Sequence, residues 1–237
     1  MNIVIILVII GLLVGLIVFL IFLFKNKATY KDLIRHFNKC NVIVAGKKGS
    51  GKDALFQKII NTRKVPYYST LNYGGYYIPL DLKKYIIKNN EGKILTYNNF
   101  LQGEIFKSKR NFYEGLDHYI SEGGVLFPSH MDSALHKVYP SLPIFYALSR
   151  HLYDCNIHVN LQMFGRLWKA LREQADYYVY VHKTIKIPFF LVIKYTTYDK
   201  LESAEKLLQP LKIRLFNKQS KCENDLYTFP IYLIMFV

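Results

Sequence analysis

The chain has 237 residues, of which 51% are hydrophobic, and its formal net charge is +15. This length accommodates one large domain, or one medium domain with appendages. The charge is typical of proteins with anionic partners such as nucleic acid, phospholipid head groups or nucleotide phosphates, although a lysine-rich proteome explains it equally well. Three widely spaced cysteines, Cys40, Cys155 and Cys222, argue against a disulfide framework or a zinc site.

The N-terminal segment is strongly apolar. Residues 3–24 contain no charge and no proline, which is enough length for a helix to cross the hydrocarbon core of a bilayer. The segment lacks the basic start and the small-residue cleavage site of a signal peptide, so we expect residues 1–24 to be an uncleaved transmembrane anchor. The basic residues that follow place the rest of the chain in the cytoplasm by the positive-inside rule: Lys25, Lys27, Lys31 and Arg35.

Residues 25–40 are predicted to link this anchor to the first strand of the domain. Within them, residues 28–40 have the spacing of a short amphipathic helix. Its apolar side would be formed by Leu33, Ile34 and Phe37.

The stretch from Asn41 to Leu55, NVIVAGKKGSGKDAL, predicts a buried strand, a glycine-rich turn and the start of a helix. The turn matches G-x-x-x-x-G-K, in which backbone N–H groups cradle phosphate oxygens and the lysine reaches the β- and γ-phosphates. We therefore expect ATP and Mg²⁺ as cofactors. The predicted nucleotide-binding residues are Gly46, Lys47, Lys48, Gly49, Ser50, Gly51, Lys52, Asp53 and Ala54. One position departs from the pattern, because Asp53 stands where a Ser or Thr hydroxyl would bind Mg²⁺.

The next elements are less regular. We predict a helix at 53–61, strand-like aromatic segments at 64–80 broken by two glycines, a short helix at 81–88 and a turn at 89–92, while residues 93–111 resist assignment. The tyrosines between Tyr67 and Tyr77 fit a core better than a base-stacking surface.

A second strand is predicted at 116–120, and it runs into Ser121-Glu122-Gly123-Gly124. In P-loop NTPases an acid at such a strand end holds Mg²⁺ or polarises the attacking water. Glu122 is the candidate, with Asp117 and Asp132 as competitors. The alternative is that Glu122 is an exposed residue in a glycine turn.

A third strand, at 156–161, is followed by Gln162, which could contact the γ-phosphate or be an ordinary surface residue. The other predicted elements are a turn-rich stretch at 125–143, helices at 144–153, 163–175 and 198–208, strands at 177–181 and 185–195, and a final segment at 229–237 that is a last strand or a docking tail. In the 163–175 helix the residues expected toward the core are Leu167, Trp168 and Leu171. Pro188 predicts an edge or a bend in the 185–195 strand.

These elements predict an α/β fold with a mostly parallel sheet, plus one N-terminal transmembrane helix. The P-loop domain would span residues 41–184, and residues 185–237 would form a strand-rich extension.

Three runs together resemble the Zot family, the zonula-occludens-toxin-like ATPases related to filamentous phage assembly proteins. They are Ser121-Glu122-Gly123, PSLPIFYALSRHLYDCNIHVNLQ at 140–162 and LREQADYYVYV at 171–181, and the resemblance covers residues 41–181. It implies a homo-oligomeric ATPase in the host inner membrane, with its ATPase domain in the cytoplasm. Such a protein couples ATP hydrolysis to virion assembly and to export of phage DNA, with coat or channel proteins as further partners.

The resemblance also implies roles for individual residues. Glu122 would be the catalytic acid and Gln162 the sensor, while Arg150 and Arg172 would be candidates to reach a γ-phosphate, within the subunit or across a subunit boundary. The candidate metal ligands are Asp53, from the chemistry of its carboxylate, and Glu122, from the resemblance.

The chain departs from the family at Asp53, at Ser121, where an Asp is usual, and in having its anchor at the N-terminus. Asp53 could ligate Mg²⁺ directly and offset the acid missing at Ser121, or its charge could repel phosphates. Two alternatives therefore stay open, a nucleotide-binding membrane scaffold without turnover and a DNA packaging or conjugation ATPase.

Overall fold

The computed structural model describes residues 3–86, 88, 91–94, 115–187, 190–198 and 231–236. The strands are β1 (Val42–Ala45), β2 (Tyr67–Ser69), β3 (Tyr77–Pro79), β4 (His118–Ile120), β5 (Ile157–Leu161), β6 (Tyr177–Ile187), β7 (Phe190–Tyr198) and β8 (Ile231–Phe236). The α-helices are α1 (Ile3–Lys39), α2 (Lys52–Arg63), α5 (Gly123–Leu126), α6 (Asp132–Val138), α7 (Leu142–Leu152) and α8 (Lys169–Arg172), with 3₁₀ turns η1 (Leu82–Tyr85), η2 (Ser129–Met131) and η3 (Phe164–Arg166).

The strands form one eight-stranded sheet in the order β3-β2-β4-β5-β1-β6-β7-β8. From β3 through β6 all neighbours are parallel, whereas β7 and β8 add to the edge as antiparallel strands. The predicted α/β fold with a mostly parallel sheet is confirmed. Strand β1 lies between β5 and β6, so whatever follows β1 emerges at the middle of the carboxyl edge of the sheet.

Helices cover both faces of the sheet, and β1 contributes to both cores because successive side chains point to opposite faces. Val42 and Val44 pack in the core that contains α2 and the end of α1. Ile43 and Ala45 pack in the other core, which contains α7 and Trp168. All four β1 side chains are fully buried, as expected of a central parallel strand.

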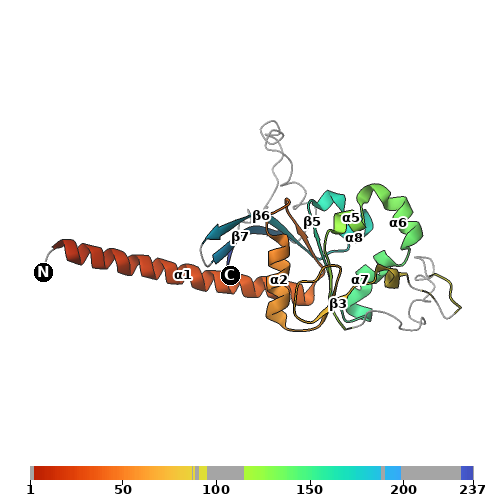
Figure 1. The fold of residues 1–237 in the computed structure, drawn as a ribbon, viewed down its shortest axis with the longest axis horizontal. Coiled ribbons are helices and arrows are strands. Elements are labelled where there is room, and N and C mark those ends of the chain that lie inside the picture. Colours follow the sequence, from red (N-terminus) through yellow and green to blue (C-terminus); the bar gives the residue numbers. More distant parts are fainter. Residues whose placement is uncertain are drawn as a thin grey trace, which may run out of the picture.

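Helix α1 is continuous from Ile3 to Lys39, and its N-terminal part extends away from the sheet (Figure 1). The predicted linker helix at 28–40 is therefore the last part of α1 and not a separate element. Its predicted apolar side is confirmed at Leu33 and Phe37, which are buried against the sheet and α2. Tyr30 also contacts α2, because its hydroxyl lies 2.8 Å from Thr62 Oγ1.

The large apolar side chains described between Leu7 and Ile21 are all exposed, from 42% at Leu20 to 70% at Leu12. Among the residues that the structure describes, no helix has both the length and the apolar character needed to cross a membrane. The predicted transmembrane span at residues 3–24 is therefore unsupported.

The prediction of one amphipathic helix at 163–175 is wrong. Turn η3 ends at Arg166, Leu167 pairs with Pro128 in an antiparallel bridge, and only α8 is helical beyond it. The Trp168 amide donates to Phe127 O at 2.7 Å, so the backbone here bonds to a distant segment and not to its own preceding turn. The predicted inward side chains Leu167, Trp168 and Leu171 are nevertheless buried, because the bridge and α8 keep them on the core side.

Other boundaries also differ from the prediction. Helix α6 occupies part of the stretch predicted as turns, and the helix predicted at 81–88 is reduced to the single 3₁₀ turn η1. The strand predicted at 185–195 is divided between the end of β6 and β7, with Pro188 outside the described residues. The C-terminal segment 229–237 contains strand β8. Tyr198, where a helix at 198–208 was predicted to begin, is the last residue of β7, and the rest of that predicted helix lies outside the described residues, as does Cys222.

Candidate functional site

The glycine-rich loop 46–51 connects β1 to α2 at the carboxyl edge of the parallel strands. Ligands of open α/β sheets bind at this edge, and the N-terminus of a helix favours anions there. The loop begins where Gly46 N donates to Leu161 O of β5 at 3.2 Å. It ends where Leu55 N donates to Gly51 O at 3.0 Å, which is a helical bond of the first turn of α2.

Two glycines of the loop have no room for a side chain. A Cβ atom on Gly46 would collide with the carbonyl oxygen of Val181, and one on Gly51 would collide with Thr184 Oγ1. Gly51 also has a φ of 96°, in the left-handed region that favours glycine. Thr184 Oγ1 donates to Ser50 O at 2.5 Å, so the loop is held directly on the end of β6.

Lys52 folds back over the loop. Its side chain is buried, and Nζ donates to Lys47 O at 3.1 Å. Burial lowers the pKa of Lys52, while the charges of Asp53 and Glu122 oppose this shift. The ammonium is thus held inside the loop, near both acids, with a backbone carbonyl as its hydrogen-bond partner.

Asp53 is held by three side-chain hydrogen bonds, all to one carboxylate oxygen. Its Oδ1 atom accepts hydrogen bonds from Asn160 Nδ2 at 2.6 Å, Tyr73 OH at 3.0 Å and Ser121 Oγ at 3.4 Å. These donors come from β5, from the segment between β2 and β3, and from the residue after β4. Tyr73 is buried, and both this burial and the charge of Asp53 raise the pKa of its hydroxyl. One carboxylate oxygen therefore joins α2 to three other parts of the sheet edge.

Asn160 is a site residue that the sequence reasoning missed. Its side chain is fully buried near the end of β5, where Nδ2 donates to Asp53 and Oδ1 accepts from Glu122 N at 3.2 Å. The sequence contained one indication of its role. Asn160 is a polar residue between Val159 and Leu161, near the end of a predicted core strand.

Glu122 follows β4 with a φ of 54°, and its side chain is exposed. The next residue must be glycine, because a Cβ atom on Gly123 would collide with Val159 Cγ1. The backbone of Glu122 is fixed by Asn160, and its charge acts on Lys52. The structure therefore brings Glu122 to the loop, as predicted from its place at a strand end.

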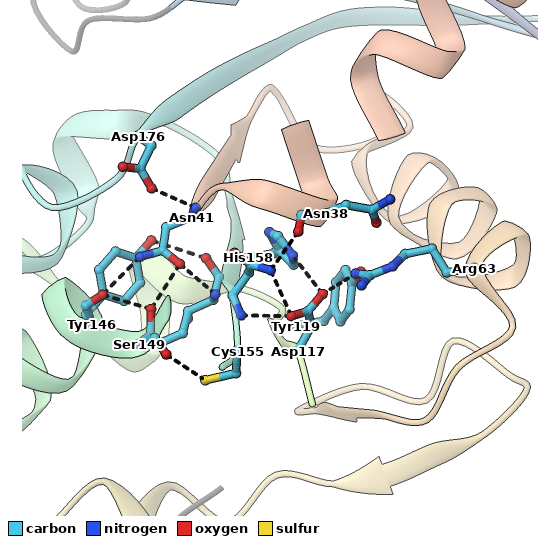
Figure 2. Close-up of polar contacts among 12 residues, drawn as sticks. Asn38, Asn41, Arg63, Asp117, Tyr119, Tyr146, Ser149, Cys155, His158 and Asp176 are labelled. Carbon is cyan, nitrogen blue, oxygen red and sulfur yellow. Dashed lines mark hydrogen bonds and ion pairs between the residues drawn. The ribbon is translucent and has the colours of Figure 1, made fainter. Parts of the chain in front are cut away.

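The two competing acids lie elsewhere. Asp117 precedes β4 at the amino edge of the sheet, where it forms an ion pair with Arg63 and accepts from Asn156 N at 2.7 Å (Figure 2). Burial raises the pKa of Asp117, but the His158 ring at 3.7 Å, the charge of Arg63 and the hydrogen bond from Asn156 N outweigh this and hold the pKa well below its usual range. Asp132 lies on α6 beside His136 and is half exposed.

The polar residues predicted around the phosphates are only partly brought together. Gln162 follows β5, and its Oε1 accepts from Arg166 Nη1 at 3.2 Å, an arginine that the sequence reasoning did not select. Arg172 Nη1 donates to Phe164 O at 3.4 Å and packs on η3. Arg150 lies at the opposite, amino edge of the sheet, where it binds Asp176 Oδ1 and Lys39 O, each at 2.9 Å. The structure does not place Arg150 with the loop of its own subunit.

Comparison with models of known protein families gives no match, and comparison with curated proteins gives none either. Among solved structures, the N-terminal domain of zonular occludens toxin from Neisseria meningitidis is similar at 18% identity and a TM-score of 0.41, over 70% of this chain and 88% of that one. The genome packaging NTPase B204 of Sulfolobus turreted icosahedral virus 2, in complex with ATP-gammaS, is similar at 16% identity and a TM-score of 0.41, over 70% of this chain and 95% of that one. The resemblance inferred from the sequence thus has counterparts among solved structures, at a similarity too low to assign an activity.

Proposed function

We propose that this protein is a Mg²⁺-dependent ATPase whose site is the loop 46–52 with Asp53 and Glu122. The observation that carries the proposal is the arrangement at the carboxyl edge of the sheet. A glycine loop leads from a buried central strand into α2, Lys52 is folded into that loop, and Glu122 follows β4 close enough for its charge to act on Lys52.

Phosphate binding follows from the loop. Backbone N–H groups and the N-terminus of α2 favour an anion at this place. Lys52 Nζ, which now donates to a carbonyl, would exchange that bond for a stronger charge-assisted one to a phosphate oxygen. Because the ammonium is already buried in position, little side-chain ordering remains to be done on binding.

The residues at the site fit a magnesium ion. Mg²⁺ prefers oxygen ligands and is usually bound through one or two carboxylates together with substrate phosphates. The Asp53 carboxylate and the Ser121 hydroxyl lie 3.4 Å apart beside the loop, and Glu122 is the next residue. In the described part of the chain no group of three or more His, Cys, Asp or Glu could hold a metal ion. When bound, the ion would neutralise charge on the β- and γ-phosphates.

Hydrolysis would use Glu122 as the base. Its exposed carboxylate accepts a proton from a water molecule as the water oxygen bonds to the γ-phosphorus. The bond from that phosphorus to the β–γ bridging oxygen breaks, and ADP leaves with the electron pair. Lys52 stabilises the charge that develops on the phosphate oxygens, and Gln162, oriented by Arg166, is the group that would contact the γ-phosphate or the water.

We further propose that the ATPase is an oligomer tethered to the cytoplasmic membrane and that it moves phage DNA during virion assembly, together with coat or channel proteins. The apolar run at residues 3–24, the exposed apolar side chains described between Leu7 and Ile21, and the basic residues directly after the run support the tether. The net charge of +15 and the family resemblance support DNA as the cargo. Hydrolysis is expected on the cytoplasmic side.

The test is phosphate release by the purified full-length chain in detergent, with Mg²⁺ and either single-stranded or double-stranded DNA. We expect turnover by the wild-type chain and none by Lys52→Ala or Glu122→Gln. The matched control is Glu173→Gln, which removes an exposed carboxylate that pairs with Lys169 on the same helical turn, and this variant should turn over normally. Equal rates in all four proteins would contradict the proposal, and stimulation only by double-stranded DNA would favour packaging or conjugation over phage export.

A second candidate is a membrane scaffold that binds nucleotide without turnover. It is favoured by one observation, the three hydrogen bonds that already occupy Asp53 Oδ1. Tight ATP binding by the wild-type chain without phosphate release would select this function.

A further inference from the structure

Two departures from the phosphate-loop pattern lie next to each other in space. In such sites the residue after the loop lysine supplies a hydroxyl to Mg²⁺, and the residue after a neighbouring strand supplies a carboxylate. Here Asp53 follows the lysine and Ser121 follows β4. The two side chains are 68 residues apart in the sequence, yet Ser121 Oγ donates to Asp53 Oδ1 at 3.4 Å.

The pair as a whole keeps the same chemistry. One carboxylate and one hydroxyl are present at the two positions, so the number of oxygen ligands and the net charge equal those of the usual arrangement. Each position taken alone would weaken a metal site. Taken together, they supply the same carboxylate and hydroxyl, but the carboxylate is on α2 and the hydroxyl follows β4, the reverse of the usual arrangement.

Other contacts hold the Asp53 side chain and the backbone of Ser121. Ser121 is buried, and its amide donates to Thr70 Oγ1 at 2.8 Å. The Asp53 carboxylate is held by Asn160 and Tyr73 and lies in the first turn of α2, where the helix N-terminus favours negative charge. The two groups are therefore positioned by the protein alone.

Asn160 links this pair to Glu122, the proposed general base. The same amide donates to Asp53 through Nδ2 and accepts from the Glu122 backbone through Oδ1. Supporting groups of this kind orient metal ligands and tune their affinity. The position of the Asp53 carboxylate and that of Glu122 are consequently set by one buried side chain.

We infer that Asp53 and Ser121 have exchanged their roles in holding Mg²⁺, with Asp53 as the carboxylate ligand from the loop and Ser121 as the hydroxyl partner from β4, and with Asn160 as a positioning residue. This inference rests on the proposed ATPase function and specifies how its metal is held. A single exchange of roles explains both Asp53 and Ser121, and the site retains a carboxylate and a hydroxyl to hold the metal needed for turnover.

The test restores the usual arrangement. Mn²⁺ is titrated into the full-length chain with the non-hydrolysable analogue AMPPCP, and bound Mn²⁺ is measured by electron paramagnetic resonance. We expect Asp53→Ser to weaken Mn²⁺ binding by on the order of tenfold or more. The Asp53→Ser/Ser121→Asp double variant, which has the same composition as the wild type, should recover to within about threefold of it because the two positions are coupled.

The possible outcomes are distinct. Mn²⁺ affinity of Asp53→Ser equal to that of the wild type, or a double variant as weak as Asp53→Ser, would overturn the exchange while leaving nucleotide binding intact. Absence of both AMPPCP and Mn²⁺ binding in the wild-type chain would overturn the proposed function as well. Circular dichroism of each variant, with Glu173→Gln as the charge-removal control, identifies any loss that comes from misfolding.

Discussion

Replacing Asn160 by leucine removes a buried amide and keeps the branched shape of the side chain. It deletes the bond from Nδ2 to Asp53 at 2.6 Å and the bond from the Glu122 amide to Oδ1 at 3.2 Å. A hydrogen bond to a charged group contributes about 1.5–3 kcal/mol and one between neutral groups about 0.5–1.5 kcal/mol. We therefore expect the free energy of unfolding to fall by about 2–4 kcal/mol, and the affinity for Mn²⁺ with AMPPCP to fall by roughly tenfold to a hundredfold.

The chain offers a matched control at the other edge of the sheet. Asn156 is also a buried asparagine, and its Nδ2 donates to the Asp117 carboxylate at 3.0 Å and to Asn38 O at 3.3 Å. Asn156→Leu should cost a similar free energy of unfolding, measured by urea denaturation, but should leave Mn²⁺ affinity unchanged. Equal loss of Mn²⁺ affinity in the two variants would refute the reasoning, because the effect of Asn160 would then be one of stability alone.

Three further predictions concern the rest of the molecule. Gly123→Ala should lower the free energy of unfolding by about 1–3 kcal/mol, because its Cβ would collide with Val159, whereas Gly124→Ala meets only Arg166 Cβ at 3.2 Å and should cost less in the same urea titration. Burial lowers the pKa of His118 from 6.5 to about 3. Between these two pH values the unfolded chain binds a proton at this residue and the folded chain does not. Stability should therefore fall as pH decreases through this window, by about 2 kcal/mol at pH 5 from this residue, and His118→Asn should flatten the dependence of urea midpoints on pH; an unchanged slope would contradict the assignment. Arg150→Ala should lower the free energy of unfolding by less than about 1 kcal/mol, through loss of its partly exposed pair with Asp176, and should leave ATP affinity unchanged; a loss of ATP affinity would show that Arg150 acts at the nucleotide site.

The glycine-rich loop and its flanking elements could be predicted because their structure depends on residues that are close together in the sequence. The pattern from Val42 to Arg63 contains a buried strand, obligatory glycines and a helix start, and each is a short-range property, so the loop could be predicted together with its lysine. Glu122 could be predicted because it follows a recognisable strand directly. The mostly parallel sheet followed from the alternation of strands and helices along the chain.

The residues that were missed depend on contacts across the fold. Asn160 forms a hydrogen bond with Asp53, which lies 107 residues away in the sequence. The periodicity of apolar residues cannot predict such a long-range contact. Arg150 was a candidate for the phosphates because the family resemblance implied it, but the end of α7 that carries it lies at the amino edge of the sheet, which only the topology reveals. The false helix at 163–175 has apolar spacing that also suits a bridge to Pro128 followed by a single turn, and pairing with that distant segment decided the outcome.

The central claim is that the loop 46–52 binds the phosphates of ATP, and equilibrium binding of a fluorescent ATP analogue to the full-length chain tests it most directly. The account predicts that the wild-type chain and Glu122→Gln bind the analogue with similar affinity, since Glu122 acts on the water and not on the bound phosphates. It predicts that Lys52→Ala loses binding by at least about tenfold, the loss of one charge-assisted bond to phosphate. Undiminished binding by Lys52→Ala, in a protein that remains folded, would contradict the account.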